Sequence, residues 1–208
     1  MGSQKILTPV ARLSFPQLWT AKSFEGGQSQ FSATLLFDEK AQQTPEFAAM
    51  VAAATEVKNA KFGAKYVGEL RNPFRKGELK TRPEANKDGS VAYMDGYGPG
   101  IVFVRVSSGE EYPPTIYDPI KAEILAPHDR KAIYAGSYCV AVVQAIAYDK
   151  GGNKGVKFGF SCLQKVADGQ SFGGGGTGAE LLPDTVALPD GATTPAAPAT
   201  GTNGEIDF

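Results

Sequence analysis

The stretch YCVAVVQAIAYDKGGNKGVKFGFSCLQKV, residues 138–166, carries the clearest β-strand signal in the chain. Its two ends, 138–148 and 156–166, are rich in β-branched and aromatic residues and flank DKGGN (149–153), which has the composition of a hairpin loop. The apolar face of the second run consists of Val156, Phe158, Phe160 and Cys162, and Lys157 and Lys165 alternate with it. The stretch therefore predicts a long β-hairpin with one face in the core.

Other strands are predicted upstream of this hairpin. Residues 10–15 and 31–37 alternate between core-facing and outward positions, and Glu25-Gly26-Gly27-Gln28 between them supplies the residues that a tight turn needs. A further strand is expected over 101–107, and a weaker one over 115–124. These patterns indicate a mainly β body.

One helix interrupts the strands, over residues 44–60. Thr44 is a suitable N-cap and Pro45 suits the first helical position. An apolar face is predicted from residues spaced three and four apart, namely Phe47, Met50, Val51, Ala54 and Val57. The sequence therefore places one amphipathic helix after the second strand.

Charge divides the chain into two parts. Residues 1–167 contain 21 basic and 16 acidic side chains, a net charge of +5, whereas residues 168–208 contain no basic and 6 acidic side chains, a net charge of −6. The second part is rich in Gly and Pro and has few large apolar residues, so it cannot offset the entropy of ordering. We expect a folded basic body, 1–167, and a disordered acidic tail, 168–208.

The basic surplus is concentrated in residues 57–87, which hold nine basic and three acidic side chains with aromatic rings between them. Little periodicity follows Gly68, so a long, mobile insertion is predicted. Proteins that bind single-stranded nucleic acid need cations along the phosphates and rings that stack on bases. A solvated charged loop is the alternative, but such a loop would mix the two signs.

Two more aromatic positions are candidates for base stacking. On the strand over 101–107, Val104 should face the core while Phe103 and Arg105 face outward. Phe103 could equally pack beneath the basic insertion. Tyr97 lies in a Gly-rich segment, where exposure and core packing are both open.

Enzyme chemistry is poorly supported. His128 is the sole histidine, and Cys139 and Cys162 lack the spacing of a metal site, so no catalytic residue, metal or cofactor is predicted. A DNA-cleaving site built from the carboxylates between Asp95 and Asp118 remains an alternative. No apolar run approaches the roughly 18 residues of a membrane span, so we expect no membrane contact and a cytoplasmic location with reduced thiols.

Two groups of residues carry a resemblance to a known family. The first comprises Arg12-Leu13-Ser14-Phe15, Leu18-Trp19, Lys22, Gly26-Gly27 and Phe31-Ser32, and the second comprises Tyr134-Ala135-Gly136-Ser137-Tyr138-Cys139-Val140, Ala147-Tyr148-Asp149, Gly152-Asn153-Lys154-Gly155-Val156 and Phe172-Gly173-Gly174. They resemble the opening hairpin and last two strands of a family of bacteriophage single-stranded DNA-binding proteins with an OB fold. The resemblance covers roughly residues 8–175, and only loosely 57–100.

The resemblance implies an OB fold, a five-stranded Greek-key barrel, with one inserted helix, elaborated loops and a disordered C-terminal tail. It also implies a protein that coats single-stranded DNA in the bacterial host cell during phage replication or recombination. A phage structural or assembly protein is the alternative, and a homo-oligomer is left open. Composition, rather than the family, supplies most of the predicted DNA contacts: Arg12, Lys58, Lys61, Phe62, Lys65, Tyr66, Arg71, Phe74, Arg75, Lys76, Tyr97, Phe103 and Arg105.

The tail ends in alternating acidic and apolar residues, Glu205-Ile206-Asp207-Phe208. It is similar in kind to the acidic tails of bacterial and phage replication single-strand binders, which recruit replication and repair proteins and restrain DNA binding. We therefore predict that these four residues bind replication or recombination proteins and that the tail competes with DNA for the basic body.

Overall fold

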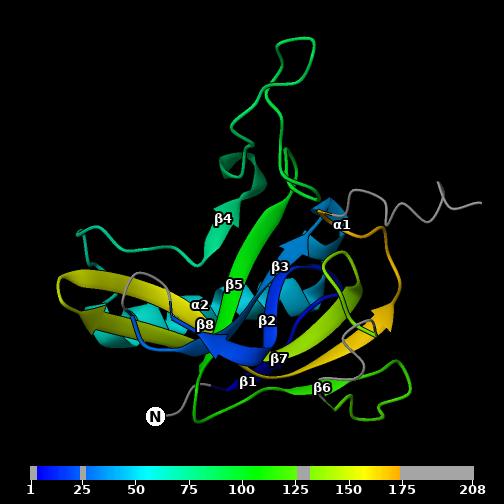
Figure 1. Ribbon diagram of the computed structural model, residues 1–208. Helices are drawn as coiled ribbons and strands as arrows, with labels where there is room; N and C mark the ends of the chain where they lie inside the picture. The colour runs from blue at the N-terminus through cyan, green and yellow to red at the C-terminus, as the bar shows by residue number, and fades with distance from the viewer. Residues whose placement is uncertain (1–3, 24–26, 126–131, 174–208) are drawn as a thin grey trace, which may run out of the picture. The chain divides into compact units, whose positions relative to one another are not determined.

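The computed structural model describes residues 4–23, 27–125 and 132–173, and it is mainly β (Figure 1). The strands are β1 (Lys5–Leu7), β2 (Ala11–Lys22), β3 (Gln30–Phe37), β4 (Phe74–Lys76), β5 (Val102–Gly109), β6 (Thr115–Tyr117), β7 (Tyr138–Lys150) and β8 (Asn153–Ala167). The helices are α1 (Glu39–Gln42) and α2 (Pro45–Phe62), followed by a single 3₁₀ turn, Gly77–Leu79. None of the helices in these ranges is long and apolar enough to cross a membrane.

Five strands close into a barrel in the order β2-β3-β5-β8-β7. The ring closes where β7 pairs with β2, with Ala11 opposite Cys139 and Arg12 opposite Tyr138. All neighbours are antiparallel except β5 and β8, which run parallel. This is the predicted OB-type barrel. The short strands β1, β4 and β6 extend it by pairing with β7, β5 and β8.

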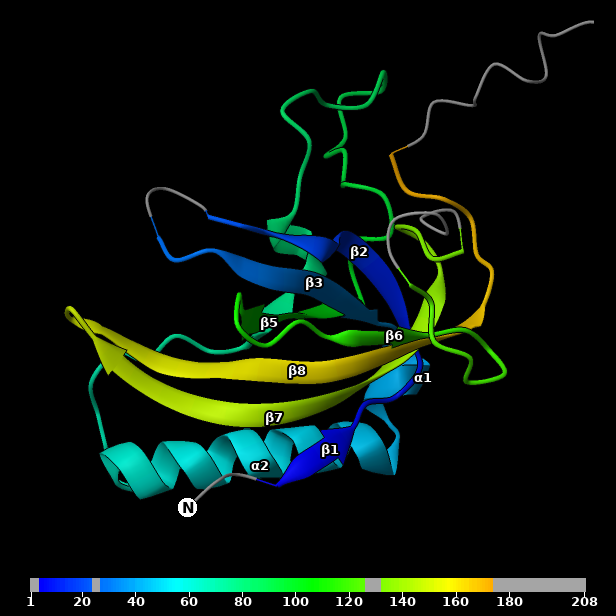
Figure 2. The ribbon, with the colours of Figure 1, turned by 60° about the horizontal axis from the view of Figure 1, so that its bottom comes forward.

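The long terminal hairpin is confirmed as β7 and β8 (Figure 2). Its turn is tighter than predicted, because Asp149 pairs with Lys154 and Lys150 with Asn153. Only Gly151 and Gly152 remain outside the ladder, with φ of 58° and 81°. A two-residue turn with both φ values positive matches the twist of the strands, and glycine adopts it without steric cost.

The core fills the barrel, and α2 covers part of it. Inward side chains from different strands, such as Leu35, Val104 and Phe158, have no exposed surface. Helix α2 begins as predicted, with the Thr44 hydroxyl accepting a hydrogen bond from the amide of Phe47, and it packs beside β7 and β1 (Figure 2). Met50 and Ala54 are buried from this helix. Val51 was expected there too, but it is 42% exposed and the prediction was wrong for this residue.

A second, smaller apolar cluster covers the end of the outer face of β3 and β5 where Leu36 pairs with Phe103. It contains Leu36, Tyr97 and Phe103, with Phe172 packed against them. The described chain thus remains packed on the body beyond Ala167, and one compact unit extends to Gly173. Nearly all of the predicted tail, including Glu205 to Phe208, lies outside the described residues.

Candidate nucleic-acid interface

A large groove crosses the outer face of β3 and β5, with a volume of about 1410 Å³. Its basic lining residues come from five separate segments: Lys22, Arg71, Arg75, Lys76, Lys80, Arg105, Lys150 and Lys157. No carboxylate is among the described residues that line it. The barrel's second and third strands form this face, and the β7–β8 turn lies at one edge. These are the surfaces with which OB folds bind oligonucleotides.

The floor of the groove is polar. Ser32 and Thr34 of β3 are both buried, and Arg105 of β5 stands opposite Thr34 in the antiparallel register. The Arg105 guanidinium donates a long hydrogen bond, 3.4 Å, to the Ser32 hydroxyl. The side chain itself remains exposed. The floor therefore presents an oriented guanidinium to the groove.

One wall is formed by part of the basic insertion. Arg71 docks on the β7–β8 hairpin, where its amide donates to the carbonyl of Lys154 and its carbonyl accepts from the amide of Val156. Gly155 permits this approach, because a Cβ there would lie 2.6 Å from the carbonyl oxygen of Arg71. From this anchor the chain runs into β4, which pairs with β5. The insertion was predicted to lack regular structure, and over residues 74–79 that prediction was wrong.

Phe15 is a groove residue that the sequence interpretation missed. It is 47% exposed and has φ of 45°, a conformation that is rare for residues other than glycine. The β2–β3 register shifts between Ser14 and Gln17, so a bulge places the ring in the groove lining. The Lys80 ammonium lies 5.8 Å from the ring centroid. In the sequence, Pro16 is the residue that could have indicated this bulge, because it interrupts the alternation of the strand.

Six of the predicted contacts line the groove: Arg71, Phe74, Arg75, Lys76, Phe103 and Arg105. The rings among them are largely core residues. Phe74 packs 5.7 Å from Phe158 and 5.5 Å from Phe47, and Phe103 is only 3% exposed. Phe103 faces outward as predicted, but the second apolar cluster covers it and Arg75 lies over its ring at 5.5 Å. The cations of this set, rather than its rings, are the side chains exposed in the groove.

The other predicted contacts lie elsewhere. Tyr97 is buried at 9% exposure, where its ring packs edge-on against Phe103 and its hydroxyl lies 3.2 Å from that of Ser14. Burial raises the pKa of Tyr97 above its ordinary value. The remaining aromatic and basic candidates occupy the C-terminal part of α2 and the loop after it, outside the groove lining: Lys58, Lys61, Phe62, Lys65 and Tyr66.

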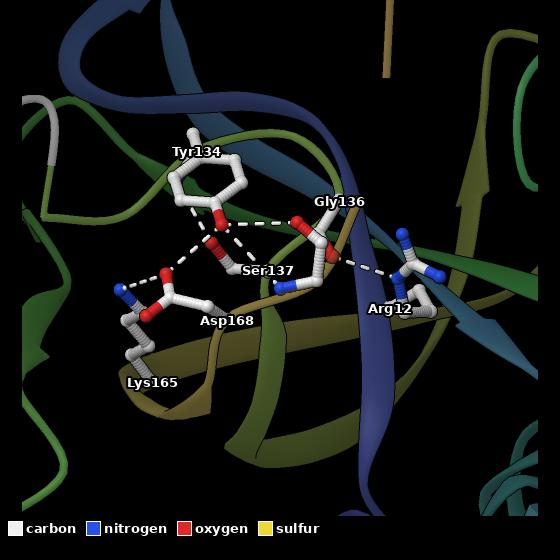
Figure 3. A network of polar contacts seen from close by, with 7 residues as sticks. Arg12, Tyr134, Gly136, Ser137, Lys165 and Asp168 are labelled. Atoms are coloured by element: carbon white, nitrogen blue, oxygen red, sulfur yellow. Dashed lines mark hydrogen bonds and ion pairs between the residues drawn. The ribbon is translucent and has the colours of Figure 1, made fainter. Parts of the chain in front are cut away.

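Arg12 of β2 connects two segments that are distant in sequence, at Gly136 and at Gln170 (Figure 3). Its Nε donates to the carbonyl of Gly136 at 2.7 Å, and Nη2 donates to the carbonyl of Gln170 at 2.6 Å. The guanidinium lies between two rings, 4.8 Å from the centroid of Tyr138 and 4.6 Å from that of Phe172. Arg12 was predicted as a phosphate contact; two of its five N–H donors bond these carbonyls.

A polar network fixes the same segment. The Lys165 ammonium lies 2.7 Å from Asp168 Oδ1, to which the Tyr134 hydroxyl donates at 2.9 Å (Figure 3). These two hydrogen bonds, that of Lys165 first, hold the pKa of Asp168 below its ordinary value. Lys165 was placed on the outer face of its strand, but it is 9% exposed because a register shift in β7–β8 turns it toward Tyr134.

Two of the carboxylates on which the nuclease alternative rests, Asp95 and Asp118, are engaged in separate contacts. Asp95 forms an ion pair with Arg82 and accepts a hydrogen bond from the amide of Gly173 at 2.8 Å. Asp118 accepts from the amides of Ile120 and Ala122 in its own turn. Within the part of the chain that is described, no three His, Cys, Asp or Glu side chains are grouped to hold a metal. His128 lies outside the described residues.

An OB barrel with a basic groove over its second and third strands, here β3 and β5, is characteristic of OB-fold proteins that bind oligonucleotides. The chain belongs to the family of the single-stranded DNA-binding protein of Enterobacter phage Enc34, whose family model matches residues 4–187. No curated protein sequence matches the chain.

Solved structures show the same fold. The single-stranded DNA-binding protein from bacteriophage Enc34 in complex with single-stranded DNA superimposes with a TM-score of 0.62 at 19% identity, covering 80% of this chain and 88% of that one. The same phage protein described without DNA gives 0.61 at 17% identity, covering 84% and 88%. The single-stranded DNA-binding protein gp2.5 of bacteriophage T7 gives 0.54 at 12% identity, covering 90% and 99%.

Proposed function

We propose that this protein binds single-stranded DNA without sequence preference, in the groove over β3 and β5. The observation that carries the proposal is the clustering of eight cations along one groove whose described lining contains no carboxylate. A phosphate backbone is the extended polyanion that such a groove fits, and its contacts carry no sequence information. Family membership and the named ligand of the Enc34 protein support the same ligand class.

Phe15 supplies the second component of the binding site. A single strand exposes its base faces, and stacking on an aromatic ring tolerates any base. The ring of Phe15 is half exposed within the groove, and its backbone conformation is strained, which is a frequent property of binding residues. We assign phosphate contacts to the basic residues of the groove and base stacking to Phe15.

The experiment that tests this function is a fluorescence-anisotropy titration of labelled oligo-dT with the full-length protein, repeated with the matching duplex and across salt concentrations. Salt-sensitive binding to the single strand, much tighter than to the duplex, is the expected result. Absence of binding at low salt, with the acidic tail removed as well, would overturn the proposal.

The biological role that follows is protection of single strands during phage replication or recombination. The alternative role, a structural or assembly component, would show as stable incorporation of the protein into purified phage particles. Immunoblotting of purified particles and of infected-cell lysates distinguishes them. The replication role requires the protein in the lysate and its absence from particles.

The acidic C-terminal segment is proposed to compete with DNA and to recruit replication or recombination proteins through Glu205, Ile206, Asp207 and Phe208. Residues 168–208 carry a net charge of −6, opposite to that of the groove. Deletion of residues 180–208 should tighten oligo-dT binding at low salt, and less at high salt, because added ions screen the competition. Equal affinity with and without the segment at low salt would refute the competition.

A further inference from the structure

A second hollow of about 270 Å³ lies beside the groove, on the outer face of β7 and β8. It shares Ser107 and Lys157 with the groove lining. Strands β5 and β8 pair only over two residues of each, and Ser107 is the last residue of β5 that pairs with β8. The hollow therefore opens where β5 leaves β8, and it continues the groove past Gly159, which lines it without a side chain.

The charge of this hollow matches that of the groove. Lys5 and Lys157 line it, and no described lining residue is acidic. Lys5 is exposed and its backbone is held by pairing with Gln144 of β7. Lys157 is exposed between the buried Val156 and Phe158, so its side chain points out of the barrel. Two cations, one from β1 and one from β8, which both pair with β7, thus line one concave surface.

An exposed aromatic ring stands at the edge of the hollow. Tyr112 is 72% exposed, yet its backbone is fixed by a turn in which its amide donates to the carbonyl of Gly109 at 2.9 Å. Pro113 and Pro114 follow directly and restrict the backbone further. Tyr112 thus presents a largely solvent-exposed ring from a turn whose backbone is restrained.

Polar groups complete the lining. The Ser108 hydroxyl oxygen is buried without a hydrogen-bond partner among the described residues, and Ser161 adds an exposed hydroxyl. Glu110 and Glu111 precede Tyr112 on the same turn but do not line the hollow. The described lining thus offers two cations, hydroxyl groups and one exposed aromatic ring.

We propose that this hollow is a second nucleotide subsite, which binds the part of a single strand that extends beyond the groove. Lys5 and Lys157 contact phosphate, and Tyr112 stacks on a base. The proposal rests on the proposed function and deepens it, because it assigns a path for the strand and a longer site. Its signature is a dependence of affinity on oligonucleotide length that the groove alone does not produce.

The test is a titration of labelled dT oligonucleotides spanning about 4 to 16 nucleotides, the range of OB-fold site sizes. The wild type is compared with the full-length double variant Lys5→Ala, Tyr112→Ala, which leaves every groove residue in place. The matched control is Lys40→Ala, Ile120→Ala, which removes one exposed cation and one exposed large side chain outside both linings.

The double variant should bind the shortest oligonucleotides like the wild type and bind the longest about tenfold more weakly, the loss expected for one stacked base. On the longest oligonucleotide its salt slope should be shallower by about 0.7, the effect of one phosphate contact. The control should follow the wild type at every length.

Identical length dependence in the double variant and the wild type would overturn the subsite, as would an equal loss at all lengths. The proposed function survives both of these outcomes, because wild-type binding to the shortest oligonucleotides depends on the groove. Failure of the wild type to bind any of the oligonucleotides would overturn the subsite and the proposed function together.

Discussion

Replacement of Arg75, Arg105 and Lys157 by alanine should make DNA binding markedly less dependent on salt. These residues lie on β4, β5 and β8, all three line the groove, and all are exposed. For single strands each phosphate contact contributes about −0.7 to the slope of log K against log salt, so the eight groove cations set a limit of about −5.6. Loss of three contacts should make the slope shallower by about 2.1, and weaken Kd about 100-fold at 0.1 M salt.

The assay is the oligo-dT anisotropy titration at four or more salt concentrations. A second triple variant, Lys58→Ala, Lys61→Ala and Lys65→Ala, removes the same charge from positions outside the groove lining. Its slope should change by less than that expected for one contact, because distant exposed charges are screened. Equal changes in the two variants would mean that net charge, and not the groove, governs binding. An unchanged slope in the groove variant would refute the assignment of phosphate contacts outright.

Three further predictions concern single residues. Phe15→Ala should weaken oligo-dT binding by about 1–3 kcal/mol while Phe15→Trp retains it, and a wild-type affinity for the alanine variant would exclude base stacking on this ring. Phe103→Ala should lower the free energy of unfolding in urea by about 3–5 kcal/mol, because the ring is buried, and wild-type stability would contradict that packing. The lowered pKa of Asp168 means that its contacts with Lys165 and Tyr134 stabilise the folded state above the ordinary value of 3.8, and that this contribution is lost as the pH falls through the lower folded-state pKa. The melting temperature of Asp168→Asn should therefore lie below that of the wild type at neutral pH and approach it in acid, whereas a constant difference would contradict the linkage.

The β7–β8 hairpin and helix α2 could be predicted because their signals are local. Alternation of buried and exposed positions along 156–166 is visible in a single segment, and so is the N-cap at Thr44. The same alternation marked Lys157 as outward-facing, but nothing local shows that it shares a groove with Arg75. The proximity of Lys157 to Arg75 depends on β5 pairing with both β4 and β8, and β5 and β8 are far apart in the sequence.

The aromatic candidates show a different limit of sequence interpretation. The alternation of residues along β5 correctly predicted that Phe103 faces away from the barrel interior. An outward-facing ring is exposed, however, only where nothing covers it. Tyr97, from the loop before β5, and Phe172, far along the sequence, pack against Phe103 and bury it. Phe15 is the reverse case, since a bulge and a positive φ bring into the groove a ring that regular alternation would have assigned to the core.

The division of the basic stretch 57–87 follows from the position of the inserted helix. Helix α2 has 18 residues and is therefore about 27 Å long, which carries the chain from the end of β3 toward the β7–β8 turn. Near this turn Lys154 lies 5.9 Å from the ring centroid of Tyr66, and Arg71 docks against Gly155. The chain then returns along β5 as β4.

The residues of this stretch that precede Arg71 lie outside the groove lining. Arg71 and, after it, Arg75, Lys76 and Lys80 line the groove. Helix α2 packs on β7, β8 and β1, and none of its residues lines the groove over β3 and β5. The amino-acid composition alone indicated one basic stretch of 31 residues, 57–87. Arg71 docks at Gly155, and this contact requires the assembled β7–β8 hairpin. The contact determines which cations of the stretch 57–87 can face a common ligand.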